Sequence, residues 1–207
     1  MTTYTIYAST TNGGYIESDN ANAATCKAGS GFSVNDPTYG YMCFMYDGSL
    51  YSAFEAFWEF NTSVITDSPI TRATLNCQFR ITTPKIDTYQ VRLFDFGASL
   101  TSADWRTPTQ FAACTLLAHK AASAITDFAQ VDFDDDAMAA NLNTSGVTRM
   151  VAGSALFAAD GTPGSGAYGY GYVDTSVKTV MPRLTVVAGK PPPYRAMMSP
   201  QRNYLRR

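Results

Sequence analysis

Histidine and regularly spaced cysteines are scarce in this chain of 207 residues, and this limits the chemistry that it can support. Its single histidine is His119, and Cys26, Cys43, Cys77 and Cys114 form no Cys-x-x-Cys pair and no Cys/His cluster. Because structural zinc sites need such clusters, we expect no metal site and no cofactor. We expect buried free thiols, with a Cys26–Cys43 disulfide as the alternative.

Long apolar runs are also missing, so no segment is predicted to span a membrane. The first residues, MTTYTIYAS, lack the charged, apolar and small segments that mark a signal peptide in that order. We therefore expect a protein that is made in the cytoplasm and kept there or released by lysis.

Helical patterns are few and short. In LTSADWRTP, Thr101 or Ser102 can cap a turn with Asp104 in it, and this predicts one or two turns that Pro108 ends. Acidic residues also precede the alanine-rich stretch AMAANLN and predict a short helix with carboxylates at its start. These are Asp132, Asp134, Asp135 and Asp136. A calcium site is the alternative interpretation of the aspartates.

Alternation of apolar and polar residues with a period of two dominates residues 1–188. In ATLNCQFRI the apolar set is Ala73, Leu75, Cys77, Phe79 and Ile81. Turn-forming clusters separate this run from several similar ones, as is typical of a sandwich. The pattern predicts an all-β fold: an antiparallel β-sandwich, or jelly roll, over residues 1–188, with one or two short helices.

The run YSAFEAFWEF is the most aromatic of these predicted strands. One face carries Phe54, Ala56, Trp58 and Phe60, and the other carries Glu55, Phe57 and Glu59. Four positions apart on a strand, the two glutamates lie about 13 Å from each other, too far for a glycosidase pair. We therefore expect them on a solvated or interfacial face, with Phe57 as an aromatic exception among them.

Charge divides the chain into two parts. Residues 1–188 carry ten lysines and arginines and all 17 acidic residues, a formal charge of −7, whereas the side chains of residues 189–207 sum to +5. The acidic body argues against nucleic acid as its main partner, because binding to a duplex requires a basic face. We define residues 189–207 as the C-terminal arm and predict that it is extended.

The composition of the C-terminal arm favours docking on a partner. PPPY at 191–194 favours a stiff polyproline II conformation, and nineteen extended residues span roughly 60 Å. The predicted partner-binding residues are Pro191, Pro192, Pro193, Tyr194, Arg195, Met197, Met198, Arg202, Tyr204, Leu205, Arg206 and Arg207. Their rings, thioethers and guanidinium groups suit pockets on a neighbouring subunit.

Two other motifs lack the context that their chemistry needs. GSGAYG at 164–169 has dinucleotide-binding spacing, but alternating tyrosines follow it where a helix is required. His119 has no Gly-x-Ser-x-Gly elbow nearby and no obvious orienting acid. We therefore expect no catalytic residue and no enzymatic activity.

Three stretches together resemble a known module: FWEFNTSVI followed by ITRATL, VRLFDFGASLTSADW, and MPRLTVV. They are similar to the jelly-roll domains, of the DNRLRE and carbohydrate-binding-like kind, that recur in tailed-phage virion proteins and bacterial surface proteins. The resemblance covers roughly residues 3–188. It places Trp58, Phe60, Ala73 and Leu75 at core positions and residues 100–105 at a capped turn, and it implies no catalytic or metal-binding residue.

Together these features favour a structural protein of a tailed-phage virion, most of all a head decoration or cement protein. The expected partners are the major capsid protein or other virion subunits, in a homo-oligomer such as a trimer, without nucleic acid or membrane. A neck or tail position is an alternative. A second alternative is a carbohydrate-binding module with Phe57, Tyr168, Tyr170 and Tyr172 stacking on sugar rings, and a hydrolase is the least favoured.

Overall fold

The computed structural model describes residues 1–29, 33–35, 39–81, 88–125, 129–134, 136–164, 171–174 and 181–190. The strands are β1 (Thr2–Asn20), β2 (Ser33–Asn35), β3 (Tyr39–Tyr46), β4 (Tyr51–Asn61), β5 (Ile70–Ile81), β6 (Thr88–Leu93), β7 (Thr115–Ala121), β8 (Ala129–Asp134), β9 (Val147–Ser154), β10 (Gly171–Asp174) and β11 (Arg183–Ala188). The helices are short: α1 (Ala23–Ala28), α2 (Pro108–Ala113), α3 (Asp136–Ala140) and α4 (Ala155–Ala158), with 3-10 turns η1 (Thr62–Val64), η2 (Ser102–Asp104) and η3 (Ala122–Ala124). The chain is therefore all-β, as predicted.

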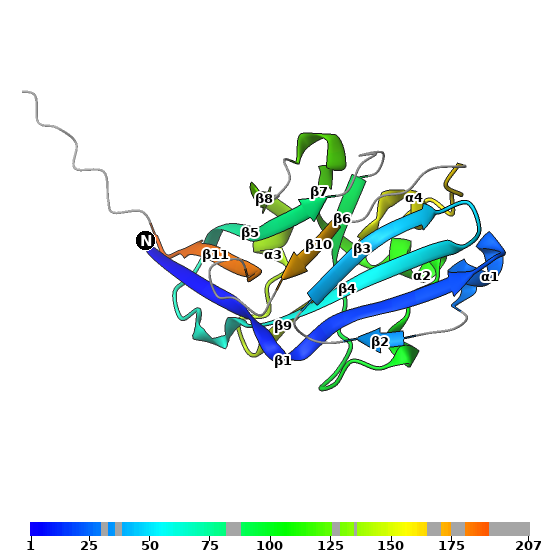
Figure 1. Ribbon diagram of the computed structural model, residues 1–207. Helices are drawn as coiled ribbons and strands as arrows, with labels where there is room; N and C mark the ends of the chain where they lie inside the picture. The colour runs from blue at the N-terminus through cyan, green and yellow to red at the C-terminus, as the bar shows by residue number, and fades with distance from the viewer. Residues whose placement is uncertain are drawn as a thin grey trace, which may run out of the picture.

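The strands form two antiparallel sheets that share β1. The first half of β1 pairs with β11, which pairs with β5, which pairs with β8. The second half of β1 lies between β2 and β4, and the second sheet continues through β9 and β6 to β7. β3 follows β9 along the same edge of β4, and β10 connects β3 to β5, which nearly closes the sandwich (Figure 1).

β1 passes from one sheet to the other at a bulge between Ala8 and Gly13. Gly13 has a φ of +144°, and a Cβ added there would lie 2.6 Å from the carbonyl oxygen of Phe57. Only glycine allows the two backbones to approach this closely, so Gly13 fixes where β1, running beside β4, passes into the second sheet. Figure 1 shows the resulting bend in β1.

The inner core lies between the two sheets. We use this name for the larger cluster of buried side chains, which includes Ile6, Trp58, Phe60, Leu75, Val91, Leu117, Phe133, Met138, Met150, Leu184 and Val186. The inward set predicted for β5 is confirmed for Ala73, Leu75 and Cys77, each of them at most 1% exposed. Nearly all of these residues come from strands whose apolar positions alternate, as the sequence predicts.

The outer core lies on the opposite face of the second sheet. It consists of Ile16, Cys26, Phe44, Ala53, Phe57, Phe96, Trp105, Phe111, Val151 and Phe157. Three short helices, α1, α2 and α4, and the segment 94–107 supply the covering side chains. The second sheet is therefore buried on both faces along β4, where the sequence predicted burial on only one.

The helices confirm one predicted turn and correct another detail. The backbone N–H of Thr101 donates to the Asp104 carboxylate at 2.8 Å, which confirms the predicted capped turn. Pro108 does not merely end that turn: it is the first residue of α2, because proline fits the first helical position, where no N–H partner is needed. Neither α1 nor α4 was predicted. Among the described residues no helix is long and apolar enough to cross a membrane.

Candidate functional site

An acidic–aromatic face lies on the same side of the second sheet as the inner core, toward the C-terminal end of β1. We define it as Tyr15, Glu17 and Asp19 of β1, Tyr41 of β3 and Phe54 of β4. Glu17 pairs with Phe54 and Asp19 with Ser52 across the β1–β4 ladder. Because side chains two apart on a strand share a face, the three β1 residues point to the same side. All five are partly exposed, unlike the inner-core residues further along the same strands.

Three rings of the acidic–aromatic face form one contact group. The ring centroids of Tyr15 and Tyr41 lie 4.7 Å apart, edge to face. Phe54 lies 6.2 Å from Tyr15 and 5.8 Å from Tyr41. The rings are held by three neighbouring strands, so the surface beside the carboxyl groups is rigid and aromatic.

Among the described residues, no basic side chain forms an ion pair with the two carboxyl groups of this face. Burial, the charge of Asp19 and a hydrogen bond between the two carboxyl groups together raise the pKa of Glu17 to about 7, with burial as the largest cause. One buried oxygen of Asp19 accepts no hydrogen bond. The face therefore presents an acid pair that suits a cationic group.

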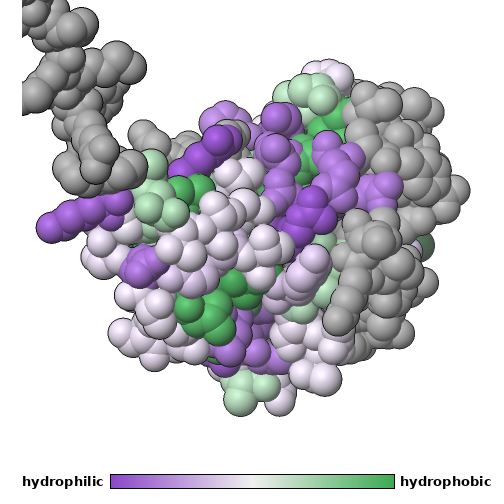
Figure 2. Space-filling model, turned by 90° about the vertical axis from the view of Figure 1, so that its left-hand side faces the viewer, coloured by the Kyte–Doolittle hydropathy of each residue, from purple (hydrophilic) through white to green (hydrophobic). Residues whose placement is uncertain are grey.

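A second candidate site is a polar groove of about 200 Å³ on the outer surface of the first sheet. Its lining residues are Arg72, Thr74 and Asn76 of β5, Asp132 of β8, and Thr185 and Val187 of β11. Of these, Thr74 and Asn76 are outward positions of β5 that the alternation in ATLNCQFRI predicts as a solvated face. The groove lies at the end of the molecule that faces the viewer in Figure 2, where the coloured surface is mainly polar or neutral, with small hydrophobic patches.

Hydrogen bonds fix the central side chains of the groove. Asn76 donates its amide N–H to the Asp132 carboxylate, and its amide oxygen accepts from the Thr185 hydroxyl at 2.8 Å. Beside the groove, Arg183 donates to Gln130 at 2.8 Å, and Tyr7 on β1 is 43% exposed. Ordered donors and acceptors next to an exposed ring suit a small polar ligand with hydroxyl groups.

Phe57 is not available for sugar stacking, and that prediction was wrong. Its side chain is 0% exposed and lies in the outer core, 5.6 Å from the ring of Phe96 and 6.2 Å from the ring of Phe94. The reason is that the segment 94–107 covers the face of β4 that the alternation left open. A sugar ring would have to displace this segment to reach Phe57.

The other predicted binding residues lie outside the part of the chain that the structure describes. Tyr172 is on β10, but its side chain is not described. The predicted binding residues that the structure does not describe are Tyr168, Tyr170, Pro191, Pro192, Pro193, Tyr194, Arg195, Met197, Met198, Arg202, Tyr204, Leu205, Arg206 and Arg207. Their predicted roles stay predictions.

The two glutamates of β4 differ from their predicted solvated or interfacial setting. Glu59 is half-buried and accepts hydrogen bonds from Arg149 at 2.6 Å and from Asn12 at 2.7 Å. Glu55 is 1% exposed, accepts one bond from the Arg106 backbone N–H at 3.0 Å, and has a second oxygen without a partner. Burial raises the pKa of Glu55 well above its usual range. Sequence reasoning missed this buried acid.

The cysteines and the histidine carry no assembled site in the described residues. All four thiols are free, without the alternative disulfide; Cys26, Cys43 and Cys77 are buried as expected, whereas Cys114 is partly exposed. Burial raises the pKa of Cys26 to about 11 and that of Cys77 further. His119 lies exposed on β7, opposite Gln90. Among the described residues, no three of the His, Cys, Asp and Glu side chains are grouped closely enough to hold a metal ion.

No protein-family model matches the chain, and a search of curated proteins returns no match. The all-β sandwich that the sequence resemblance implies is present, and its four core positions, Trp58, Phe60, Ala73 and Leu75, are all buried. The phage module itself stays a prediction. Functional inference rests on the charge division and on the two surfaces described above.

Proposed function

We propose that this chain is a non-enzymatic structural protein of a tailed-bacteriophage virion, a decoration or cement protein of the head that docks through its C-terminal arm. The observation that carries the proposal is the charge division, −7 for residues 1–188 and +5 for residues 189–207. A folded, acidic body with a basic, proline-led extension suits a protein that attaches to a neighbouring subunit.

The point where the C-terminal arm leaves the body supports a mechanical role. β11, which the arm follows directly, is hydrogen-bonded to β1 on one side and to β5 on the other. The N–H of Gly189 donates to the Pro69 carbonyl at 2.9 Å, and Lys190 is exposed. A load on the arm is therefore transmitted to a strand held by two ladders, which resists peeling better than an edge strand.

Docking through the C-terminal arm has an electrostatic and a conformational component. Exposed charge pairs are screened beyond about 8 Å at physiological ionic strength, so the contribution of five basic side chains falls with added salt. The proline run restricts the free arm and so lowers the entropy lost on docking. Oligomerisation of the body, with a trimer favoured, would multiply the arms that attach to one particle.

A deletion that starts after Lys190 tests the proposal. The cut leaves the Gly189–Pro69 bond and both cores intact, so the shortened protein should keep its circular dichroism spectrum and thermal midpoint. We expect it to lose binding to virions that lack the protein in a co-sedimentation assay. Undiminished binding by the shortened protein would refute arm docking. Electron microscopy of the bound particle separates a head position from the neck and tail alternatives.

Carbohydrate binding is a second candidate, which the polar groove favours. Its fixed Asn76, Asp132 and Thr185 side chains can bond hydroxyl groups, and Tyr7 offers a nearby ring. A glycan array with the full chain should then give signals that Asn76→Ala abolishes and Thr10→Ala, at an exposed position outside the groove lining, retains. A blank array eliminates this candidate and leaves the structural role.

A further inference from the structure

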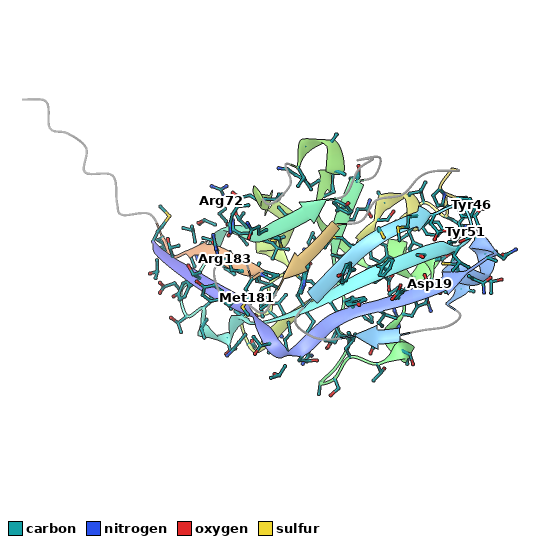
Figure 3. The ribbon with its side chains drawn as sticks, in the orientation of Figure 1. Asp19, Tyr46, Tyr51, Arg72, Met181 and Arg183 are labelled. Atoms are coloured by element: carbon teal, nitrogen blue, oxygen red, sulfur yellow. The ribbon has the colours of Figure 1, made fainter. Side chains whose placement is uncertain are left out.

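The C-terminal arm begins at the opposite end of the molecule from the acidic–aromatic face. A Cβ added at Gly189 would lie 3.6 Å from the Cα of Met1, so the arm starts beside the N-terminus. β1 runs from there to Asn20, and Glu17 and Asp19 lie near its far end. Figure 3 shows the separation: Arg72 and Arg183 lie at the arm's end of the body and Asp19 at the other.

The length of the arm limits how it can reach the face of its own molecule. Residues 2–19 of β1 cover about 55 Å along the strand at about 3.3 Å per residue. The seventeen residues 191–207 reach about the same distance when fully extended. To reach the face of its own molecule, the arm would have to extend fully along the body, and only its last residues would arrive there. A neighbouring copy can bring the face closer.

The chemistry of the face matches an arginine. Glu17 and Asp19 provide a carboxyl pair with no cationic partner among the described residues, and an Asp19 oxygen is buried without a hydrogen bond. Tyr15 and Phe54 place aromatic rings beside them. A guanidinium group can bond a carboxylate with two parallel N–H groups while its plane stacks on a ring, which an ammonium group cannot do.

The C-terminal arm supplies this group several times. It contains Arg195, Arg202, Arg206 and Arg207, and it has no acidic side chain that would be repelled by the carboxyl pair. Tyr194 and Tyr204 can add ring contacts with the aromatic side chains of the face. The body has no comparable free basic segment in its sequence.

We propose that the acidic–aromatic face of one molecule binds an arginine of the C-terminal arm of a second copy of this chain. This proposal rests on the proposed function, in which the arm is a docking segment. It identifies a second copy of the chain as a partner of that segment. Because the donor and acceptor surfaces differ, the contact is heterologous: it closes into a ring, such as a trimer, or propagates as a chain.

Sedimentation velocity of the full chain at low salt, over a concentration series, tests the proposal. The wild type should self-associate, and the double variant Glu17→Gln/Asp19→Asn should associate at least tenfold more weakly, because hydrogen bonds to charged groups are lost. The matched control, Asp47→Asn/Asp67→Asn, removes two charges outside the acidic–aromatic face and should associate like the wild type. Association that is equal in the wild type and the first variant overturns the proposal.

A second readout concerns Glu17 itself. The arrival of a guanidinium group favours the charged carboxylate, so the pKa of Glu17, about 7 in the free face, should fall when the protein is concentrated enough to associate. NMR titration above and below the association range measures it. A wild type that stays monomeric at every concentration overturns docking on a second copy, even if its own arm shifts this pKa.

The two proposals fail separately. If the arm deletion still binds virions, while association depends on Glu17 and Asp19, arm docking on the virion is wrong and this contact stands. If the double variant associates like the wild type while the arm deletion loses virion binding, this contact is refuted and arm docking on the virion stands.

Discussion

The two faces of β4 are both buried, but they are covered in different ways. On the inner face, Trp58 and Phe60 pack against strands of the opposite sheet, whose positions two ladders hold. On the outer face, Phe57 packs against Phe96 in a cluster to which three short helices also contribute side chains. Burial of an aromatic strand residue therefore has two distinct structural causes in this protein.

The difference has an energetic consequence. Strands of the inner core are paired on both sides along much of their length, so a cavity there cannot collapse without breaking ladders. The outer core is covered by helices of at most six residues, too short to be stable alone. We therefore expect the outer core to open locally while the inner core stays closed.

The largest expected effects come from truncating one phenylalanine on each face of β4. Deleting a buried ring costs about 3–5 kcal/mol, and we expect Phe60→Ala to lower the free energy of unfolding by about 4 kcal/mol and Phe57→Ala by about 3 kcal/mol. The smaller value for Phe57 follows because the short cover around Phe96 can collapse into the cavity more easily than two paired sheets can. Urea denaturation at fixed temperature measures both.

Hydrogen exchange sharpens this comparison. Phe57→Ala should speed exchange at the amides of α2 and α4 while those of β5 remain protected, whereas Phe60→Ala should speed exchange throughout the sandwich. Equal acceleration of both regions in Phe57→Ala would show that the two cores unfold as one unit. Opening of β5 before α2 would reverse the expected order.

The inner core was predictable from the sequence because its signal is local. Alternation in 73–81 placed Ala73, Leu75 and Cys77 inward, and the capped turn at Thr101 was visible in four residues. The outer core was not predictable, since the cover of Phe57 comes from residues about 40 positions later with no period of their own. Phe57 stood out as an exception, but no pattern in the sequence indicated which residues lie over it.

The candidate sites follow the same division. The outward positions Thr74 and Asn76 of β5 were predicted, whereas Asp132 was predicted at a helix start or a calcium site and lies on β8. The groove requires β8 and β11 to flank β5, and that order is a property of the whole topology. Glu17 and Asp19 carried no motif, and their place beside Phe54 depends on the register of the β1–β4 ladder after the bulge that ends at Gly13. Of the predicted stacking residues, only Phe57 could be judged, and it was wrong because the outer core covers it.

Substitution of the buried Glu55 should give the next largest change in stability. This carboxyl group lies beside the outer core with one oxygen that accepts no hydrogen bond, which is unfavourable for folding. Its raised pKa means that the folded state binds a proton more tightly than the unfolded state does. Its stability contribution is therefore complete below about pH 4.5 and is lost as the pH rises toward the folded pKa. Glu55→Gln keeps an acceptor for the Arg106 N–H and removes this dependence, so its stability should exceed that of the wild type increasingly from pH 5 to pH 8.

Denaturation curves from pH 5 to pH 8 measure the difference in unfolding free energy between Glu55→Gln and the wild type. Glu17 also has a raised pKa, but it is present in both proteins, so its contribution cancels in the difference. Glu59→Gln is the matched control, because it changes the same face of β4 but weakens the Arg149 ion pair. It should not raise stability at any pH. A gap between Glu55→Gln and the wild type that is constant with pH would refute ionisation as its cause.

The smallest expected effect lies at the start of α2, the helix that carries Phe111 into the outer core. The side-chain oxygen of Gln110 accepts bonds from the backbone N–H of Thr107 at 3.0 Å and from its hydroxyl at 3.1 Å. Gln110→Ala leaves these groups to water and should lower stability by about 1 kcal/mol. Thr109→Ala, an exposed neighbour on the same helix, should change little. If the outer core opens as a local unit, Gln110→Ala should speed exchange in α2 more than it lowers the global unfolding free energy.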